Sequence, residues 1–411
     1  MRDEVNAPRT ESSLSSVESA PSIGIVLECD RPLSTFPSIC NSVELLEKSE
    51  FSVSLFILDS MNVDIRLSGT QVSRFKRLRL LGWRQLSWLG SVVSIFLTLC
   101  RHGRNLHFLW ATQGTELIAV ALYCFVKRIP YAHFCLEIDA KANRRPFRIG
   151  IYRSVTSLAV RGATFVVVQD EVRREMFRSA YHAHNARFFL VPNSYVGSRN
   201  ERTDFLRSKY GFDRADTVVL YAGGIERWAL SEKFFSGLAH WPKELKLVLH
   251  GWSRDGFLEQ MQAHINTANG DGANVFVSSD FLSEEQYSHM VSSADVGIVW
   301  YRSDVGDNVL KIGLSSGKLA MFLRCGIPVV VPDYVEGLNE YVEKFGFGEL
   351  AHDEQLIPTA VQSIRANREV YSQKASAFFS SHLDFEKCFA PVLEAMRIET
   401  SRRTRKQSII L

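Results

Sequence analysis

Short apolar runs alternate with longer amphipathic stretches along most of the chain, beginning at residue 22. Runs rich in β-branched and aromatic residues, which are typical of strands, occur at residues 23–27, 51–58, 106–110, 131–136, 164–169 and 188–191. A helical pattern at residues 43–48 lies between the first two runs. Strands that alternate with helices predict βαβ units and a mainly parallel sheet covered by helices on both faces.

A second series of the same kind follows a polar segment at residues 195–204, which lacks periodicity and predicts a linker. Its predicted strands are residues 217–221, 245–250, 275–277, 296–300 and 327–331, and its predicted helices are residues 231–238, 254–268, 283–294 and 318–324. Two successive doubly wound domains leave a cleft between them. Such sheets bind ligands at the carboxyl ends of their strands.

The length of 411 residues also favours two domains, because single cores stop growing at about 250–300 residues. We expect a polar, disordered tail at residues 1–20, an N-terminal domain at 21–194, a C-terminal domain at 205–385, and a C-terminal helix with a basic tail at 386–411. The tail lacks the apolar core of a signal peptide. The longest apolar runs are about ten residues, half of what spans a bilayer.

The net charge of +3 conceals two stretches without any acidic residue, at 65–115 and 140–169. Residues 74–104 interleave Arg and Lys with Leu, Trp and Phe, which predicts a helix pair at an anionic membrane surface. A buried helix with a solvated basic rim is the alternative. Nucleic acid is not an expected partner, because the chain is near neutral overall and carries no recognised binding motif.

The seven cysteines are scattered, without a CxxC pair or the spacing of a zinc site. This pattern favours reduced thiols in a cytosolic protein. We therefore expect no metal site and a cytoplasmic location, with peripheral contact to the inner membrane face.

The segment GLSSGKLAMFLRCGIPVVV at residues 313–331 carries the most specific chemistry. Ser315, Ser316 and Gly317 precede a predicted helix, whose free N-terminal N–H groups favour a phosphate. Lys318 in the first helical turn opposes the helix dipole, which an anionic ligand would explain. The alternative is an ordinary serine cap beside a solvated lysine.

A Gly-Gly turn follows the predicted strand at residues 217–221. Gly223 and Gly224 would let a ligand approach the backbone closely, and Arg227 would reach a phosphate. A plain strand-to-turn glycine pair is the alternative. The dinucleotide fingerprint G-x-G-x-x-G is absent here, which argues against an NAD enzyme.

The string SSGKLAMFLRCGIPVVV resembles the nucleotide-sugar segment of GT-B glycosyltransferases, especially family 4, and the resemblance extends over about residues 190–345. It implies an α/β chain with the GT-B fold, in which two Rossmann-like, doubly wound domains face a central cleft. It places the donor diphosphate against Gly223, Gly224, Ser316, Gly317 and Lys318, and the base near Phe281 and Leu282. It also implies a retaining, metal-independent reaction, without a cofactor beyond the nucleotide-sugar donor as substrate.

The chain departs from this family at two positions. Many family 4 enzymes have two glutamates eight positions apart, which correspond here to Gly313 and Met321. The first lies near the reacting sugar and the second orients the donor ribose in those enzymes. Asp304 and Asp307, in the preceding loop, are candidates to substitute for them in part.

In the N-terminal half, PYAHFCLEIDA at residues 130–140 resembles the strand-end motif by which the family presents a His and an acid to the cleft. Glu137 is the expected general base or charge stabiliser, and His133 is a second catalytic candidate or a core histidine. The strand-to-helix turn that contains Gln113, Gly114 and Thr115 is expected on the acceptor side.

These patterns favour a glycosyltransferase that moves a sugar from a nucleotide-diphosphate sugar to a hydroxyl of a lipid-linked or polysaccharide-precursor acceptor. The missing glutamates leave open a catalytically inactive GT-B-like partner subunit. A GT-B-like sugar-nucleotide epimerase is a further alternative, although an epimerase has no acceptor for the basic N-terminal half to recruit.

Overall fold

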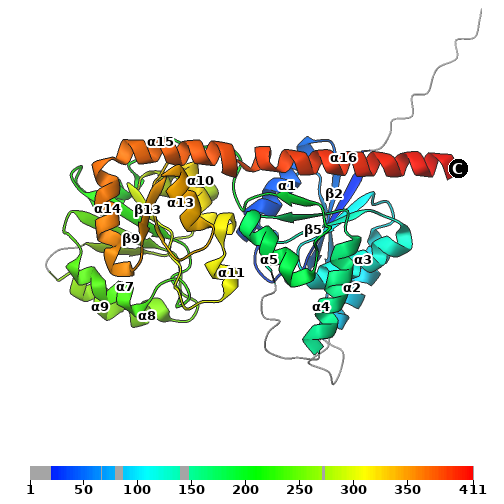
Figure 1. The fold of residues 1–411 in the computed structure, drawn as a ribbon, viewed down its shortest axis with the longest axis horizontal. Helices are drawn as coiled ribbons and strands as arrows, with labels where there is room; N and C mark the ends of the chain where they lie inside the picture. Colours follow the sequence, from blue (N-terminus) through cyan, green and yellow to red (C-terminus); the bar gives the residue numbers. More distant parts are fainter. Residues whose placement is uncertain (1–19, 66, 79–86, 139–147, 271–273, 411) are drawn as a thin grey trace, which may run out of the picture.

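The computed structural model describes residues 20–65, 67–78, 87–138, 148–270 and 274–410. Figure 1 shows two α/β domains side by side, with two helices running end to end along the top of both. Residues 1–19 of the expected tail lie outside the described residues, as do the predicted membrane residues 79–86.

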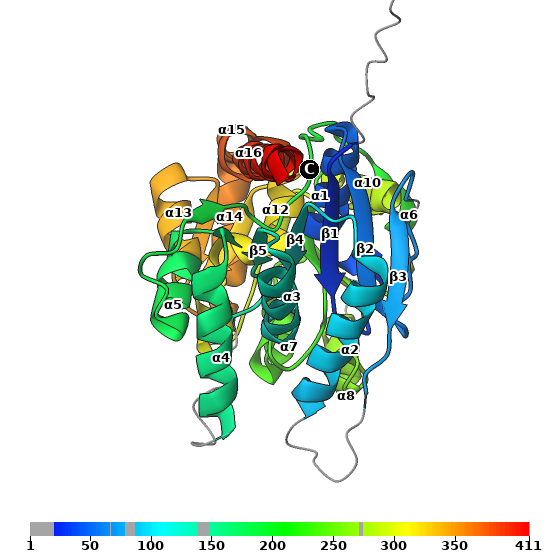
Figure 2. The same ribbon diagram turned by 90° about the vertical axis from the view of Figure 1, so that its right-hand side faces the viewer.

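The first domain is built on a fully parallel sheet of seven strands in the order β3-β2-β1-β4-β5-β6-β7. The strands are β1 (Ser22–Leu27), β2 (Ser52–Leu58), β3 (Gln71–Phe75), β4 (Phe108–Ala111), β5 (Tyr131–Phe134), β6 (Phe165–Val168) and β7 (Phe188–Leu190). The helices are α1 (Pro37–Lys48), α2 (Ser87–His102), α3 (Gly114–Lys127), α4 (Arg148–Gly162) and α5 (Glu171–Tyr181). Helix α3 lies between α2 and α4, as Figure 2 shows.

The second domain has a parallel sheet of six strands in the order β10-β9-β8-β11-β12-β13. The strands are β8 (Thr217–Ala222), β9 (Leu245–His250), β10 (Val275–Ser278), β11 (Val296–Ile298), β12 (Val329–Pro332) and β13 (Gly348–Ala351). Its helices are α6 (Phe205–Tyr210), α7 (Glu232–Gly237), α8 (Phe257–Gln260), α9 (Gln262–Ala268), α10 (Glu284–Ser292), α11 (Asp307–Leu310), α12 (Gly317–Arg324), α13 (Leu338–Phe345), α14 (Ile357–Ala366) and α15 (Arg368–Phe378). Separate apolar clusters cover its two faces.

The last helix, α16 (Phe385–Ile410), returns to the first domain after a π-helical turn at Phe379–Leu383. Its apolar side chains, among them Phe385, Phe389 and Met396, are buried in the core of the first domain. The chain therefore crosses between the domains twice. After the second crossing, the packing of α16 in the core of the first domain holds the two domains together in addition to the covalent connection.

The two parallel sheets confirm the predicted α/β class and the two-domain organisation. The apolar pattern did not reveal the edge strands β3 and β13, because their sequences, QVSRF and GELA, contain no apolar run longer than two residues. In β3 only Phe75 is buried, and in β13 only the two end residues are. The helix predicted at residues 254–268 is interrupted at Met261, which divides it into α8 and α9.

The helix pair predicted at residues 74–104 is wrong in its first part. Arg74 lies in the strand β3, and its guanidinium donates to the backbone carbonyls of Asp59 and Met61. Arg77 forms ion pairs with Glu28 and Asp30, so part of the basic charge in this stretch is neutralised within the domain. None of the helices in the described part of the chain is both long and apolar enough to cross a membrane.

Candidate functional site

Each sheet has a point at which the strand order reverses, between β1 and β4 in the first domain and between β8 and β11 in the second. Crevices outside the carboxyl ends of the strands at these points bind ligands in open α/β sheets. Gly223 and Gly224 directly follow β8, and residues 112–116 directly follow β4. Gly223, Gly224 and the predicted acceptor residues 113–115 therefore lie at the switch points of the two sheets.

The side chain of Lys318 occupies the switch point of the second domain. Its ammonium lies 4.5 Å from the ring centroid of Tyr301, 4.7 Å from that of Tyr221 and 5.8 Å from that of Trp228. It donates hydrogen bonds to the Tyr221 hydroxyl at 3.2 Å and to the carbonyl of Trp300 at 3.4 Å. The lysine thus lies in an aromatic cage formed by Tyr221 in β8, Trp228 in the segment after β8 and Tyr301 in the segment after β11.

No carboxylate among the described residues pairs with this ammonium. Burial alone lowers the pKa of Lys318 to about 7, because the charged form loses hydration and gains no acid in return. Lys318 is also the second residue of α12, where the helix dipole opposes a cation. An anion bound beside it would stabilise the charged form and remove both penalties.

The N-terminus of α12 is ordered by two hydroxyl groups. Ser316 caps the helix, since its Oγ accepts the N–H of Leu319 at 3.3 Å, and the hydroxyls of Tyr301 and Ser316 lie 2.7 Å apart. Ser315 Oγ is buried and has no hydrogen-bond partner among the described residues. A bound polar ligand would relieve the cost of that unpaired group.

Two glycines allow the backbone after β8 to pack closely against the side chain of Lys318. Gly223 has a φ of +144°, and a Cβ built on it would lie 2.9 Å from Lys318 Cδ. Gly251, which follows β9, has a φ of +154°, and a Cβ there would overlap the Gly223 carbonyl oxygen. Any larger residue at either position would displace the loop or the lysine. Gly224 accepts the Tyr221 hydroxyl at 2.7 Å, which links the same loop to the cage.

Four other predicted residues of this half do not join the cage. The guanidinium of Arg227 hydrogen-bonds Gln260, lies 3.7 Å from Asp255 and stacks on Phe257, so it is engaged with α8 and the loop before it. Asp304 is exposed and pairs with Arg302, whose hydrogen bonds lower the pKa of the Asp304 carboxyl. Phe281, predicted beside the base, is 93% exposed. Its neighbour Leu282 is half-buried against the core of the second domain.

The first domain holds the loop that precedes α12. Asp170, the N-cap of α5, accepts the Leu314 N–H at 2.6 Å and the Arg173 N–H at 2.8 Å. Arg173 donates to the side-chain and backbone oxygens of Asn308 at 2.6 and 3.1 Å. Asn193 donates its backbone N–H to the Leu314 carbonyl and its amide to the Ser315 carbonyl, at 3.1 and 3.2 Å. We call Asp170, Arg173 and Asn193 the interdomain latch.

The latch explains the glycine at position 313. Gly313 has a φ of +44°, and a Cβ there would overlap Asp170 Oδ2. The carboxylate of Asp170 therefore lies where a side chain at position 313 would begin. Met321 is buried in the core of the second domain, with its sulfur near the Ser288 hydroxyl, so this position offers an apolar group to the core.

Glu137 and His133 are in different environments at the end of β5. Glu137 has an exposed side chain, with its carboxylate 4.0 Å from the Arg31 guanidinium. His133 is buried, its Nδ1 lies 3.1 Å from the Ala111 carbonyl, and its ring packs against Phe177. Burial lowers the pKa of His133 to about 4, which keeps the ring neutral. The structure thus places His133 in the core and leaves Glu137 as the accessible member of the predicted pair.

The expected acceptor turn begins α3. Gln113 is its N-cap, Gly114 lies against the Tyr152 hydroxyl, and Thr115 Oγ1 is 3.4 Å from the same hydroxyl. The adjacent Glu116 is fully buried and accepts the N–H groups of Glu28, Thr112 and Gln113. Burial raises the pKa of Glu116 to about 7 despite these bonds. Glu116 thus joins the loops after β1 and β4.

Sequence reasoning did not identify the cage residues Tyr221, Trp228 and Tyr301 or the latch residues. Tyr221 and Tyr301 lie in or just after strands that flank the switch point, which is a usable signal for a site. The sequence contains no comparable signal for the latch. Asp170 has the position of an ordinary helix N-cap, and its second partner, Leu314, is distant in sequence.

The overlap between Gly313 and Asp170 predicts an energetic coupling. Gly313→Ala should destabilise the protein by about 2 kcal/mol, because it combines a strained φ with the overlap. In an Asp170→Ala background the penalty should shrink, because the overlapping carboxylate is gone. Urea denaturation of the four variants measures the coupling.

Gly306→Ala is the matched control, because a Cβ on this nearby glycine would meet nothing within 4 Å. It should leave the denaturation midpoint unchanged. An equal penalty for Gly313→Ala in both backgrounds would contradict the contact with Asp170.

No protein-family model and no curated protein matches the sequence. Solved structures do match over nearly the whole chain. Anabaena HepE in complex with UDP-glucose has a TM-score of 0.66 at 15% identity, over 92% of this chain and 99% of that chain. WaaG, a glycosyltransferase involved in lipopolysaccharide biosynthesis, has a TM-score of 0.63 at 12% identity, over 91% and 99%.

Sucrose-phosphate synthase from Thermosynechococcus elongatus has a TM-score of 0.60 at 14% identity, over 95% of this chain and 100% of that chain. At such identities the likeness establishes the fold. Together with the two parallel sheets, it shows that this chain has the GT-B fold, two Rossmann-like domains of the kind found in these glycosyltransferases.

Proposed function

We propose that the protein is a glycosyltransferase that uses a nucleoside-diphosphate sugar as donor. One observation carries the proposal: the Lys318 ammonium has no acidic partner among the described residues and lies in an aromatic cage at the N-terminus of α12, beside Gly223. A donor diphosphate supplies the missing negative charge. The similar HepE structures contain UDP, UDP with glucose, and UDP-glucose, which supports a donor of this class.

The proposed chemistry exchanges two bonds at the anomeric carbon of the sugar. The bond to the diphosphate oxygen breaks, and the acceptor hydroxyl oxygen bonds to the carbon. Lys318 and the free N–H groups of α12 stabilise the negative charge that develops on the departing diphosphate, and such fixed charge stabilisation is usually the largest catalytic term. The hydroxyl proton leaves to a base or to the departing phosphate.

The acceptor is proposed to lie against the first domain. Its switch point presents Gln113, Gly114 and Thr115, and the exposed carboxylate of Glu137 follows β5 at the same edge of the sheet. Glu137 is the proposed general base or charge stabiliser. We further propose a lipid-linked or polysaccharide-precursor acceptor and a retaining, metal-independent reaction, as the resemblance to family 4 implies.

The proposed location is the cytoplasm, with peripheral contact to the inner membrane face. The support for membrane contact is the excess of basic residues in the first domain. Two of these residues, Arg101 in the last turn of α2 and Arg104 just after it, are exposed. All seven cysteines are free, which accords with a reducing compartment.

A catalytically inactive GT-B-like partner subunit is the second candidate. It is favoured by Gly313 and Met321, which put no carboxylate of their own into the site. Such a subunit could retain nucleotide binding, so only turnover distinguishes it from the transferase.

Nucleotide binding should stabilise the protein. At 100 times its dissociation constant, the preferred nucleoside diphosphate among UDP, GDP and ADP, or its sugar conjugate, should add about 2.7 kcal/mol. Lys318→Met should weaken this binding about tenfold or more, because a charge-assisted hydrogen bond is lost. A thermal-shift screen followed by titration calorimetry measures both effects. Unchanged affinity in Lys318→Met, or no stabilisation by any of these nucleotides, would contradict the proposed donor site.

Glu137→Gln should lower turnover at least a hundredfold and leave donor affinity unchanged, because an amide cannot accept the proton. Glu201→Gln, which changes an exposed carboxylate in the linker, is the matched control and should turn over normally. Sugar transfer is measured as release of nucleoside diphosphate in the presence of acceptor. A normal rate in Glu137→Gln would remove this residue from the mechanism.

A further inference from the structure

Exposed apolar side chains concentrate on three neighbouring helices of the first domain. Of the seventeen large hydrophobic residues exposed in the described part of the chain, seven lie on α2, α3 and α4. They are Val93, Leu97, Leu122, Phe125, Val126, Ile151 and Leu158. Phe125 is 85% exposed and Leu158 is 68% exposed. Exposed apolar side chains gathered on neighbouring helices mark an interaction site more often than a scattered set does.

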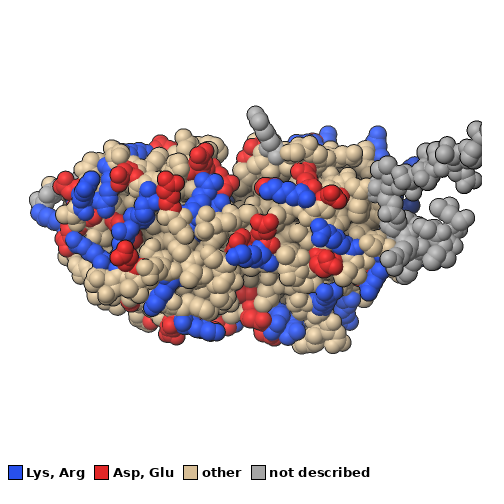
Figure 3. Space-filling model, turned by 90° about the horizontal axis from the view of Figure 1, so that it is seen from above, with Lys and Arg blue, Asp and Glu red and all other residues tan. Residues whose placement is uncertain are grey.

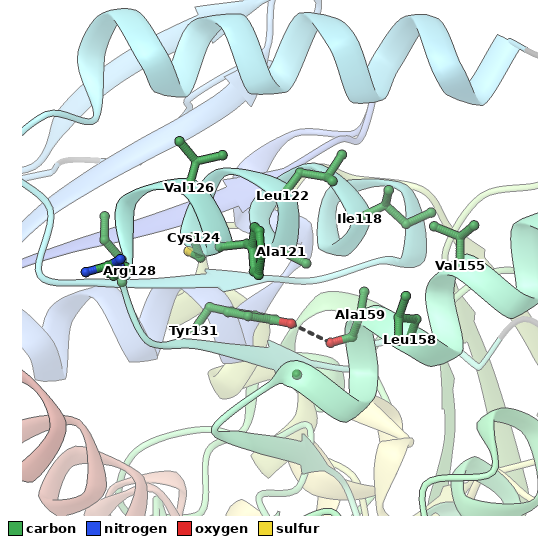
Figure 4. Close-up of a pocket in the computed structure, with 13 residues that line it drawn as sticks. Ile118, Ala121, Leu122, Cys124, Val126, Arg128, Tyr131, Val155, Leu158 and Ala159 are labelled. Carbon is green, nitrogen blue, oxygen red and sulfur yellow. Dashed lines mark hydrogen bonds between the residues drawn. The ribbon is translucent and has the colours of Figure 1, made fainter.

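A groove of about 900 Å³ runs between α3 and α4 in this surface (Figure 4). Its walls come from Leu122 and Val126 on α3 and from Val155 and Leu158 on α4. The Tyr131 hydroxyl at its edge donates to the Ala159 carbonyl at 2.7 Å, so its polar atom is already satisfied. The groove therefore offers a largely apolar lining to whatever occupies it.

A basic rim borders one end of this surface. Helices α2, α3 and α4 each connect parallel strands, so their C-terminal ends point toward the same edge of the sheet. Those ends carry exposed cations: Arg101 in the last turn of α2 and Arg104 just after it, Lys127 and Arg128 at the end of α3, and Arg161 in the last turn of α4. The single acid of the three helices is Glu116, which is buried.

The charge pattern distinguishes between occupants. On the face seen in Figure 3, acidic and basic side chains are interspersed over both domains. The three-helix surface instead combines apolar side chains with cations and exposes no acid. A second copy that docked through the same surface would bring no carboxylate to the basic rim. A bilayer with anionic headgroups supplies both an apolar phase and the complementary charge.

We propose that this surface docks the protein on an anionic phospholipid bilayer, with an acyl chain in the α3–α4 groove and headgroups at the basic rim. Phe125, Val126 and Leu158 enter the acyl boundary, while Lys127, Arg128 and Arg161 contact lipid phosphates. The surface differs from the earlier prediction at residues 74–104, because most of it belongs to α3 and α4. Docking of this kind does not depend on sugar transfer.

The test is flotation of the full chain, without nucleotide, with vesicles of phosphatidylcholine alone or mixed with phosphatidylglycerol. The wild-type protein should bind the mixed vesicles. Phe125→Ser combined with Leu158→Ser should weaken that binding at least tenfold, because two apolar anchors are lost. Ala121→Phe, which fills the groove, should also weaken it. Lys127→Gln combined with Arg161→Gln should lower the affinity for the mixed vesicles roughly fivefold for each charge removed. It should not change binding to vesicles of phosphatidylcholine alone.

Leu356→Ser combined with Val370→Ser is the matched control, since it removes two half-exposed apolar residues from the second domain. It should leave vesicle binding unchanged, and all variants should keep the wild-type thermal midpoint. Three results would overturn the proposal: no binding of the wild type to mixed vesicles, full binding by the Phe125/Leu158 variant, or a wild-type dimer that this variant dissociates. The dimer result would assign the surface to a second copy.

Discussion

The ammonium of Lys318 is held where the protein itself provides almost nothing to balance its charge. The dipole of α12 opposes it, and burial lowers its pKa to about 7. The two tyrosine rings, the Tyr221 hydroxyl and the Trp300 carbonyl offset only part of that cost. Gly223 carries no side chain because the stem of the lysine lies there. These features all concern one charge, and the proposed phosphate-bearing ligand would complete its environment.

The loop that leads to this lysine belongs to the second domain but is fixed by the first. Asp170, Arg173 and Asn193 bind residues 308–315 from across the domain boundary, and α16 anchors the chain on its return. A change in domain arrangement would therefore alter the geometry at Ser316 and Lys318. The glycine at position 313 follows from the same contact, since Asp170 occupies the space next to its Cα.

The α/β class, eleven of the thirteen strands and the serine-capped start of α12 were predictable, because they depend on local patterns of apolar residues, serine and glycine. The edge strands β3 and β13 were not, since their sequences, QVSRF and GELA, contain no apolar run longer than two residues. His133 and Glu137 are four residues apart and look alike as candidates in sequence. Only the structure shows that the His133 ring is buried in the core and that the Glu137 carboxylate is exposed to solvent. Asp170 meets Leu314 across 144 residues, a contact that no local pattern encodes.

The uptake of a proton on nucleotide binding tests the role of Lys318 most directly. At pH 8.5 a lysine with a pKa of about 7 is mostly neutral, and a bound diphosphate should raise that pKa and recharge it. Titration calorimetry with UDP in two buffers of different ionisation enthalpy should reveal uptake of close to one proton by the wild type and none by Lys318→Met. Binding of UDP to the wild type without proton uptake would contradict the assignment of Lys318 as the phosphate ligand.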